Sequence, residues 1–369
     1  MHMNTLIIDT SYLMYRSYFA NPLLTSPSGK PAGAFFGFAK TVISLLEEYR
    51  PDALIFATDT PHPTWRHHIH TAYKAGRPPL EDSMRQQIPV ILDWCNAITN
   101  NVYTCIGYEA DDIIYTLAAQ LLVENYGTGT VSRTDLQKLD DEVISISAAG
   151  KDVLTDEHLN AINNTRLVEK PNQNVHVFSS DRDLYQLFVF KHIDFIRPQK
   201  GLFKPGIFSQ QNFIDEYGLE PAQWLDYKAL VGDPSDNLQG IRGIGPKTAI
   251  KMLNHVGSLY KLLKQIGVEE IELFQRGALV RQDLTADVIQ KSIEEEWLQR
   301  WILLIQENLP QLMQTYSLAG LSLVPELEHI QKDTNLVAGI EFFKEYGFSS
   351  LLKKIQPQVA AQADGDALF

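Results

Sequence analysis

Short apolar runs alternate with amphipathic stretches in the first part of the chain. Four runs are each consistent with a buried strand: residues 6–9, 53–58, 102–106 and 175–178. Between the first two runs, residues 35–49 repeat apolar positions with the period of a helix, and a similar pattern follows Glu109. This β-α-β alternation predicts an α/β domain over residues 1–205, with a mostly parallel central sheet and helices on both faces.

The pattern changes near residue 206. From there to about residue 316 the apolar spacing predicts helices without strands, and therefore an all-helical second domain over residues 206–316. Residues 317–356 follow this domain, and helical signals stop after residue 355. Small and polar residues follow, so residues 357–369 are expected to form a disordered tail. Residues 125–173 lack sustained periodicity, and we interpret them as a surface insertion.

Composition is ordinary for a folded protein of 369 residues, with 44% hydrophobic and 21% charged residues. No apolar run is long enough to cross a membrane, and residues 1–10 lack the basic and apolar regions of a secretion signal, so we expect a cytoplasmic protein. The two cysteines, Cys95 and Cys105, have neither metal-site spacing nor the density of a disulfide scaffold, which indicates free thiols.

The net charge of −13 is unusual for a protein that binds nucleic acid, but the distribution of charge matters more. Residues 238–268 contain several lysine and arginine side chains and no acid. A second basic stretch surrounds Arg66, Lys74 and Arg77. The global charge therefore does not exclude a nucleic-acid partner.

Carboxylates follow the predicted strands. Asp9 ends the first strand, Asp59 follows the second, and the third and fourth lead into GYEADD and SSDRD. Because the carboxyl ends of parallel strands meet at one edge of an open sheet, these acids should converge there. Two carboxylates about 5 Å apart repel by roughly 3 kcal/mol at an effective dielectric near 20, so either hard cations compensate them or the acids lie apart on the surface. Ligand sets made only of oxygen favour Mg²⁺ or Mn²⁺.

Residues 232–249 read GDPSDNLQGIRGIGPKTA and combine two carboxylates with a glycine-rich turn. Asp233 and Asp236 are spaced so that they can address one cation. The glycines let the backbone approach a ligand closely, and Pro246 suits the first position of a helix. This pattern is the signature of a helix-hairpin-helix, whose N–H groups can hold a phosphate without reading a base.

Taken in order, the motifs IID, TD, GYEADD, SSDRD and GDPSDN resemble those of the 5′ nucleases, the family that contains the 5′-to-3′ exonuclease domain of bacterial DNA polymerase I and the phage flap endonucleases. The resemblance runs from about residue 6 to residue 355. It implies that residues 317–356 form a closing segment that packs back on the first domain. It implies a PIN/resolvase-like α/β domain, an all-helical helix-hairpin-helix domain, and two or more Mg²⁺ or Mn²⁺ ions. The implied ligands of the first ion are Asp9, Asp59, Glu109, Asp111 and Asp112. Those of the second ion are Asp181, Asp183, Asp233 and Asp236, and some of these carboxylates are implied to bind through water. Asp9, Asp111 and Asp181 are also implied as catalytic residues.

Residues 62–90 resemble the helical arch of that family, which gates the 5′ end of a single strand. Lys74 and Arg77 lie in its YKAGR core and are the implied catalytic cations, which would neutralise charge on the phosphate as the arch closes. Arg66 is implied to contact DNA. A solvated basic helix face is the alternative for this stretch. Its histidines are interpreted as DNA-facing or solvated, not as a metal site.

The resemblance also assigns residues to DNA binding. Tyr12, Arg16 and Phe19 match family residues near the metals and unpaired bases, although Tyr12 and Phe19 equally fit the core of the first helix. The hairpin residues implied to bind DNA are Gly240, Arg242, Gly243, Gly245, Lys247, Thr248 and Lys251. In the family this hairpin also carries K⁺ on its backbone carbonyls.

These features predict a free-standing, monomeric 5′ nuclease with no polymerase domain following it. Its implied substrates are DNA with 5′ flaps, nicks or 5′ ends, and RNA primers paired to DNA, cut by two metal ions in replication and repair. One alternative is a junction-binding protein without catalysis, which would lack carboxylates. Another is a single-strand ribonuclease, which would not need the hairpin. The terminal Leu368 and Phe369 resemble peptides that dock on sliding clamps, with a frayed terminus as the alternative.

Overall fold

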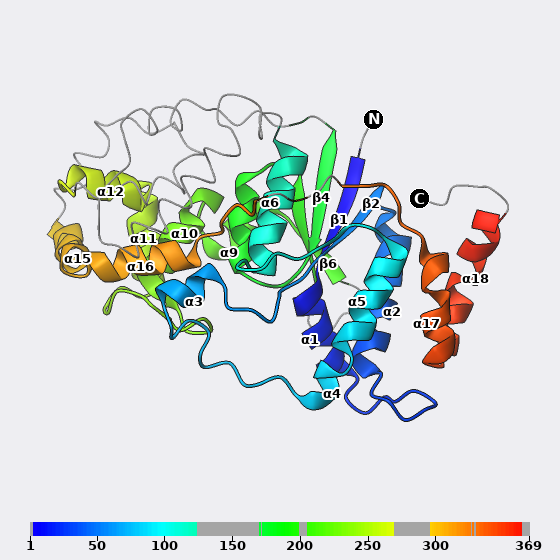
Figure 1. The fold of residues 1–369 in the computed structure, drawn as a ribbon. Helices are drawn as coiled ribbons and strands as arrows, with labels where there is room; N and C mark the ends of the chain where they lie inside the picture. Colours follow the sequence, from blue (N-terminus) through cyan, green and yellow to red (C-terminus); the bar gives the residue numbers. More distant parts are fainter. Residues whose placement is uncertain are drawn as a thin grey trace.

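A six-stranded sheet lies at the centre of the molecule, with the strand order β3-β2-β1-β4-β5-β6 (Figure 1). The computed structural model describes residues 3–123, 170, 172–198, 205–268, 296–325, 327 and 330–363. The strands are β1 (Met3–Asp9), β2 (Ala53–Ala57), β3 (Val102–Tyr103), β4 (Gln173–Phe178), β5 (Ile193–Pro198) and β6 (Pro205–Phe208). All but β6 are parallel, and β6 runs antiparallel to β5 at one edge. The predicted mostly parallel sheet is confirmed.

The central strands are apolar because both of their faces are covered. On β1, Leu6 and Ile8 face one hydrophobic core and Ile7 faces the other, and all three are fully buried. Strands of this kind are visible in a sequence as continuous apolar runs. Sequence patterns did not reveal β5 and β6, because Asp194 interrupts the apolar run of β5 and a Pro-Gly pair opens β6 as it would open a turn.

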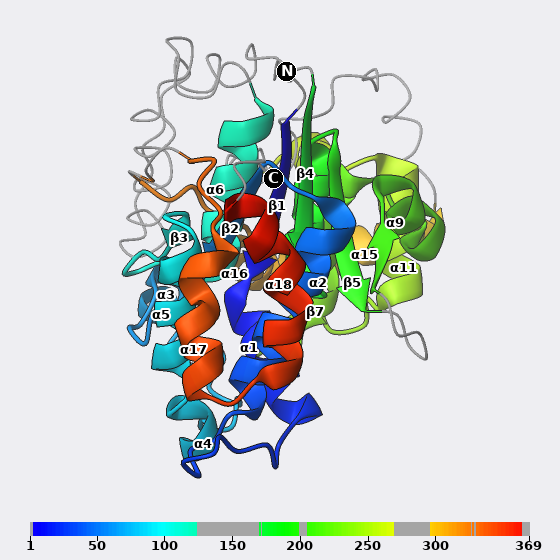
Figure 2. The same ribbon diagram turned by 90° about the vertical axis from the view of Figure 1, so that its right-hand side faces the viewer.

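Helices cover both faces of the sheet. On one face pack α1 (Thr10–Ala20), α2 (Gly33–Tyr49) and α5 (Ile88–Ile98), and on the other α6 (Ala110–Leu122). Two further helices, α17 (Ile340–Glu345) and α18 (Ser349–Ala363), lie against the first group (Figure 2). The rings of Phe343 on α17 and Trp94 on α5 have centroids 5.7 Å apart, so the end of the described chain packs on the side of the sheet that α1 and α2 cover.

The chain after β6 forms a second, mainly helical unit. Its helices are α9 (Gln210–Tyr217), α10 (Trp224–Val231), α11 (Pro246–Val256), α12 (Leu259–Gln265), α15 (Glu296–Glu307) and α16 (Leu309–Ala319). The expectation that no strand follows residue 205 is wrong, because β6 lies there and a small antiparallel ribbon joins β7 (Gly232–Asp233) to β8 (Leu238–Gln239). The ribbon requires glycine at position 240, since a Cβ on Gly240 would lie 2.3 Å from the carbonyl oxygen of Val231. The close approach of the two backbones therefore accounts for a glycine at position 240, and no bound ligand is needed to explain it.

Shorter helices lie in the connections. They are α3 (Trp65–Ile69), α4 (Asp82–Arg85), η1 (Asp183–Val189), η2 (Pro221–Gln223) and η4 (Leu336–Gly339). A disordered tail was predicted from residue 357, and this prediction is wrong as far as Ala363. Helix α18 continues to that residue through alanines and glutamines, which favour helix. Residues 364–369, with Leu368 and Phe369, and most of the predicted insertion at 125–173 lie outside the described residues.

Two simpler predictions concern cysteine and the membrane. Cys95 is buried, Cys105 is partly buried, and both are free thiols, as predicted. In the part of the chain that the structure describes, no helix combines the length and the apolar content needed to span a bilayer.

A buried carboxylate joins three helices of the second unit. Asp226 on α10 is 2% exposed and accepts a hydrogen bond at 3.0 Å from the backbone N–H of Leu259, the first residue of α12. The Tyr316 hydroxyl of α16 also donates to it. Burial raises the pKa of Asp226 from 3.8 to about 7, although both hydrogen bonds act in the opposite direction.

Asp226 should therefore make the stability of the protein depend on pH. Between about pH 4 and pH 7 the unfolded chain loses the proton while the folded chain keeps it, so the free energy of unfolding should fall as pH rises, by at most about 1.4 kcal/mol per pH unit from this group. Urea unfolding of the wild-type protein and of Asp226→Asn at several pH values in this range measures the effect. The wild-type protein should lose stability relative to the variant, and parallel curves would show that Asp226 keeps its charge when folded.

Candidate functional site

Three carboxylates stand where strands of the sheet end. Asp9 ends β1 and caps α1, accepting the backbone N–H of Tyr12 at 3.0 Å. Asp59 follows β2 and accepts the backbone N–H of Ala110, the first residue of α6, at 2.8 Å. Asp181 follows β4. The parallel sheet thus places these acids at one edge, as the sequence predicts.

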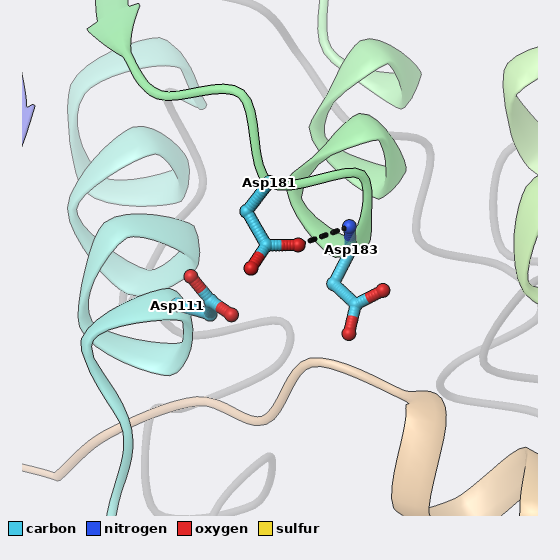
Figure 3. A group of neighbouring side chains, drawn as sticks. All are labelled: Asp111, Asp181 and Asp183. Carbon is cyan, nitrogen blue, oxygen red and sulfur yellow. Dashed lines mark hydrogen bonds between the residues drawn. The ribbon is translucent and has the colours of Figure 1, made fainter. Parts of the chain in front are cut away.

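The first turn of α6 adds Asp111 beside Asp181 and Asp183. Oxygen atoms of these three carboxylates lie within 4.8 Å of one another (Figure 3). The side chains converge from α6, from the loop after β4 and from the first residue of η1. The backbone N–H of Asp183 donates to the Asp181 carboxylate at 2.9 Å, which fixes that loop. Among the described residues, this is the one group of three such side chains that could hold an ion.

Negative charge is poorly compensated here. Burial raises the pKa of Asp9 to about 7, and the charges of Asp59 and Asp181 add to the effect while hydrogen bonds oppose it. Burial, followed by the charges of Asp181 and Asp9, holds the pKa of Asp111 well above its ordinary value. Burial also raises the pKa of Asp181. The arrangement favours either neutral carboxyl groups or a bound cation.

Two cations from the predicted arch lie against further carboxylates. Lys74 Nζ is 2.8 Å from Glu109 and 3.8 Å from Asp236, and Arg77 is 2.7 Å from Asp236. The Tyr73 hydroxyl lies between the same two acids, at 3.0 and 3.1 Å. Lys74 has a left-handed backbone (φ 53°), and its N–H donates to the carbonyl of Asp236 at 3.1 Å. The solvated-face alternative is therefore wrong for Lys74, because the arch loop (residues 72–77) is docked on the acids.

A third cation, Lys228 on α10, lies between Asp183 and Asp233. Its ammonium is 2.8 Å from Asp233 and contacts Asp183, and Lys228 is 5% exposed. Burial opposes the effect, but Lys228 lowers the pKa of Asp233 to about 2. The carboxylates described so far in this section lie together, and we call them the acid cluster: Asp9, Asp59, Glu109, Asp111, Asp181, Asp183, Asp233 and Asp236. The alternative in which the acids lie apart on the surface is wrong.

Arg66 does not face DNA, contrary to the prediction, because it is 2% exposed inside the protein. Its guanidinium donates to both oxygens of Asp112 at 2.7 and 2.8 Å, and to the carbonyls of Leu318 and Gly320 at 2.9 and 2.7 Å. Asp112 is fully buried and also accepts the backbone N–H of Ser322 at 2.9 Å. The metal-binding role predicted for Asp112 is therefore wrong as well, because the protein itself occupies both carboxylate oxygens.

Arg66 also acts on Glu109, which lies 3.3 Å away. Burial alone would raise the pKa of Glu109, but Arg66 and then Lys74 lower it to about 2. Arg66 thus pairs with two carboxylates at the start of α6 and ties that helix to the end of α16 and the residue after it.

Three residues of α1 were predicted to lie near unpaired bases. The Tyr12 hydroxyl donates to Ser180 at 3.0 Å and its ring lies 6.1 Å from that of Phe178, so Tyr12 belongs partly to the core. Arg16 is exposed. Phe19 is 67% exposed, which rules out the core alternative for this residue. Contacts of these side chains with DNA stay predictions.

The predicted hairpin leads into the N-terminus of α11. Gly245 is the N-cap and Pro246 the first helical residue, and no side chain caps this end, so its first N–H groups can serve a ligand. Gly243 has a φ of 101°, which favours glycine. Lys251 Nζ lies 3.7 Å from the centre of the Trp297 ring. Of the hairpin residues predicted to bind DNA, Arg242, Gly243, Lys247 and Lys251 are exposed, and Gly240, Gly245 and Thr248 are half-buried.

No sequence pattern singled out Tyr73 or Lys228. Tyr73 directly precedes the predicted Lys74, and this adjacency was the available signal. Lys228 is followed by three apolar residues, Ala-Leu-Val. A single lysine in such a helical turn is usually interpreted as exposed to solvent.

Two family profiles match the chain. Residues 4–170 match the 5′-3′ exonuclease, N-terminal resolvase-like domain, and residues 219–319 match the 5′-3′ exonuclease, C-terminal SAM fold. The first match contains α6 and the strand ends at Asp9 and Asp59, and the second contains Lys228 and the hairpin.

Curated relatives show the same similarity. The thermostable DNA polymerase I of Thermus thermophilus is 32% identical over 297 residues, which are 77% of this chain and 29% of that protein. The 5′-3′ exonuclease of Aquifex aeolicus is 32% identical over 258 residues, 70% of this chain and 71% of that protein. The chain thus spans about a third of the length of the DNA polymerases that it matches. A solved structure of T5 5′-exonuclease with bound zinc has a TM-score of 0.46 at 16% identity and covers 85% of this chain and 97% of that one, a score that supports no conclusion about this chain.

Loss of the Arg66 guanidinium should destabilise the fold. Arg66→Met leaves the buried Asp112 carboxylate without a counter-charge, which typically costs about 3–5 kcal/mol of unfolding free energy. Arg66→Met combined with Asp112→Asn removes the stranded charge, so it should recover a large part of that loss. Urea unfolding of both variants and the wild-type protein measures the difference. If Arg66→Met lost less than about 1 kcal/mol of unfolding free energy, the loss would be that of an exposed ion pair. This result would contradict a buried pair between Arg66 and Asp112.

Proposed function

The chain belongs to the 5′-3′ exonuclease family, and on that premise we propose that it hydrolyses DNA phosphodiester bonds from 5′ ends and at 5′ flaps. The observation that carries the proposal is the convergence of Asp111, Asp181 and Asp183 beside the cations of the arch loop. DNA is itself an anion, so a protein that only bound junctions would gain nothing from buried carboxylates that repel one another and the ligand. The arrangement suits hydrolysis assisted by cations.

The donor set fits hard divalent cations. The atoms offered by Asp111, Asp181 and Asp183 are all carboxylate oxygens, and burial raises the pKa of Asp111 and of Asp181, which a bound cation would oppose. We propose that Asp9 and Asp59 complete a first Mg²⁺ or Mn²⁺ site and that Asp183 and neighbouring acids form a second, with K⁺ at the hairpin carbonyls. Bound divalent ions would supply a Lewis acid for the phosphate and a water of lowered pKa.

The arch loop supplies positive charge that can change partners. Lys74 now pairs with Glu109, and Arg77, whose side chain is 54% exposed, pairs with Asp236. Charge-assisted contacts to carboxylate and to phosphate have similar geometry, so both cations can transfer to the nonbridging oxygens of a phosphodiester. Lys74 is the more enclosed of the two, and we propose it as the cation that stabilises charge developing on the phosphate.

The hairpin suits a duplex held by its backbone. The uncapped N-terminus of α11 and the exposed Arg242, Lys247 and Lys251 offer N–H groups and positive charge without a means of reading bases. We propose 5′ flaps, nicked duplexes, free 5′ ends and RNA primers paired to DNA as substrates, in replication and repair. Docking on a sliding clamp through Leu368 and Phe369 belongs to the same proposal and concerns residues outside those described.

Cleavage of a labelled 5′-flap duplex tests the function. The wild-type protein should cut it when Mg²⁺ or Mn²⁺ is present and not when the ion is chelated. Asp181→Ala should abolish cutting and keep most of the affinity for the flap, because the residue holds the ion and not the duplex. Glu341→Ala, which removes an exposed acid on α17, is the matched control and should cut as the wild-type protein does.

Three outcomes would point elsewhere. Cutting by Asp181→Ala at the wild-type rate would remove this residue from the chemistry. Binding without cutting by the wild-type protein would favour the junction-binding alternative. Cutting of single-stranded RNA with no response to a DNA junction would favour a ribonuclease.

Salt dependence of binding tests the hairpin. In the Asp181→Ala background, which prevents cutting, Lys247→Ala and Lys251→Ala should each reduce the slope of log affinity against log salt by roughly 1, since each lysine would release one counter-ion from a phosphate. Fluorescence anisotropy with two flap substrates of unrelated sequence measures the slope, which should change equally for both. Unchanged slopes would mean that these lysines face solvent in the complex.

A further inference from the structure

Lys228 lies between two carboxylates, Asp183 and Asp233. Its ammonium lies 2.8 Å from one oxygen of Asp233 and contacts an oxygen of Asp183. Asp183 also belongs to the group formed with Asp111 and Asp181. One ammonium therefore serves two carboxylates, and one of these, Asp183, lies beside Asp111 and Asp181, for which no ion pair is found among the described residues.

The partner carboxylate Asp233 has both oxygens engaged. One oxygen accepts the Lys228 ammonium, and the other accepts the backbone N–H of Ser235 at 2.9 Å and its hydroxyl at 2.5 Å. An ion that bound between Asp183 and Asp233 would have to displace the ammonium or share these oxygens with it. Lys228 therefore affects how many ions the acid cluster can hold.

Lys228 is also fixed in place, unlike Arg77 of the arch loop. It is 5% exposed on α10, where the indole N–H of Trp224 donates to the carbonyl of Arg182 at 2.7 Å. Arg182 directly precedes Asp183, so this hydrogen bond locks the helix that carries Lys228 to the loop that carries its partner. Arg77, by contrast, is half exposed on a surface loop and can leave its carboxylate.

We infer that Lys228 is a positioning residue that acts as a built-in counter-ion: the free protein binds one divalent ion tightly near Asp111 and Asp181, and a second must compete with the ammonium for Asp183. At an effective dielectric near 20, charges this close interact strongly enough to change an ion affinity by about tenfold or more. The second ion then becomes tightly held only when a phosphate of the DNA supplies additional oxygen ligands, which couples full metal loading to the presence of substrate. This inference rests on the proposed function, since it assumes that the acid cluster binds divalent ions.

Binding of Mn²⁺ in the absence of DNA tests the inference without an activity assay. Titration followed by the electron paramagnetic resonance of free Mn²⁺ should show one tight ion on the wild-type protein and a second, weaker one. Lys228→Met keeps the length of the side chain and removes its charge, so the second ion should bind about tenfold or more tightly. Lys228→Met combined with Asp183→Asn should lose this gain, because the carboxylate that the ammonium shields is gone.

The control is Lys344→Met, which removes an exposed lysine on α17 and should leave both affinities as in the wild-type protein. Lys228→Gln provides a second neutral variant, and circular dichroism and thermal unfolding show which variants are folded. A folded Lys228 variant with wild-type stoichiometry and affinities would overturn the role of Lys228 alone. A wild-type protein that bound no Mn²⁺ would overturn the proposed function itself, and with it this inference.

Discussion

Repulsion among buried carboxylates is the constraint on which the rest of the structure depends. Asp9, Asp111 and Asp181 meet because parallel strands end at one edge of the sheet and α6 begins there. Their proximity does not stabilise the fold, since burial and neighbouring charge raise the pKa of each. Apolar cores on both faces of the sheet hold the strands in place against this repulsion. An arrangement that opposes folding is expected where a protein binds cations and performs chemistry.

The cations around the acid cluster divide into two kinds. Arg66 and Lys228 are buried and fixed by their surroundings, and they hold carboxylates whose positions do not need to change. Lys74 and Arg77 come from the arch loop, and their contacts with Glu109 and Asp236 can pass to a phosphate. The buried pairs thus set the geometry of the site, whereas the proposed function assigns the loop pairs to contact with the substrate.

Sequence reasoning reached the sheet and the acid cluster because both leave local, repeated signals: apolar runs for covered strands, and acids at the ends of those runs. It failed where the partner of a residue lies far away in the chain. Arg66 sits in a basic stretch and was assigned to DNA, yet its partner Asp112 is 46 residues away. Lys228 was missed because a lysine on a helix gives no sign of what it contacts. The edge strand β6 begins with Pro-Gly, so its pairing depends on β5 rather than on its own pattern.

The central claim is that the acids at the carboxyl edge of the sheet hold divalent ions. Anomalous diffraction from crystals grown with Mn²⁺ tests it most directly, because the signal locates the ion independently of any activity. The account predicts a strong peak within bonding distance of carboxylate oxygens of Asp111, Asp181 or Asp183. A protein whose anomalous peaks lie only elsewhere, for example beside the histidines of residues 62–70, would contradict it.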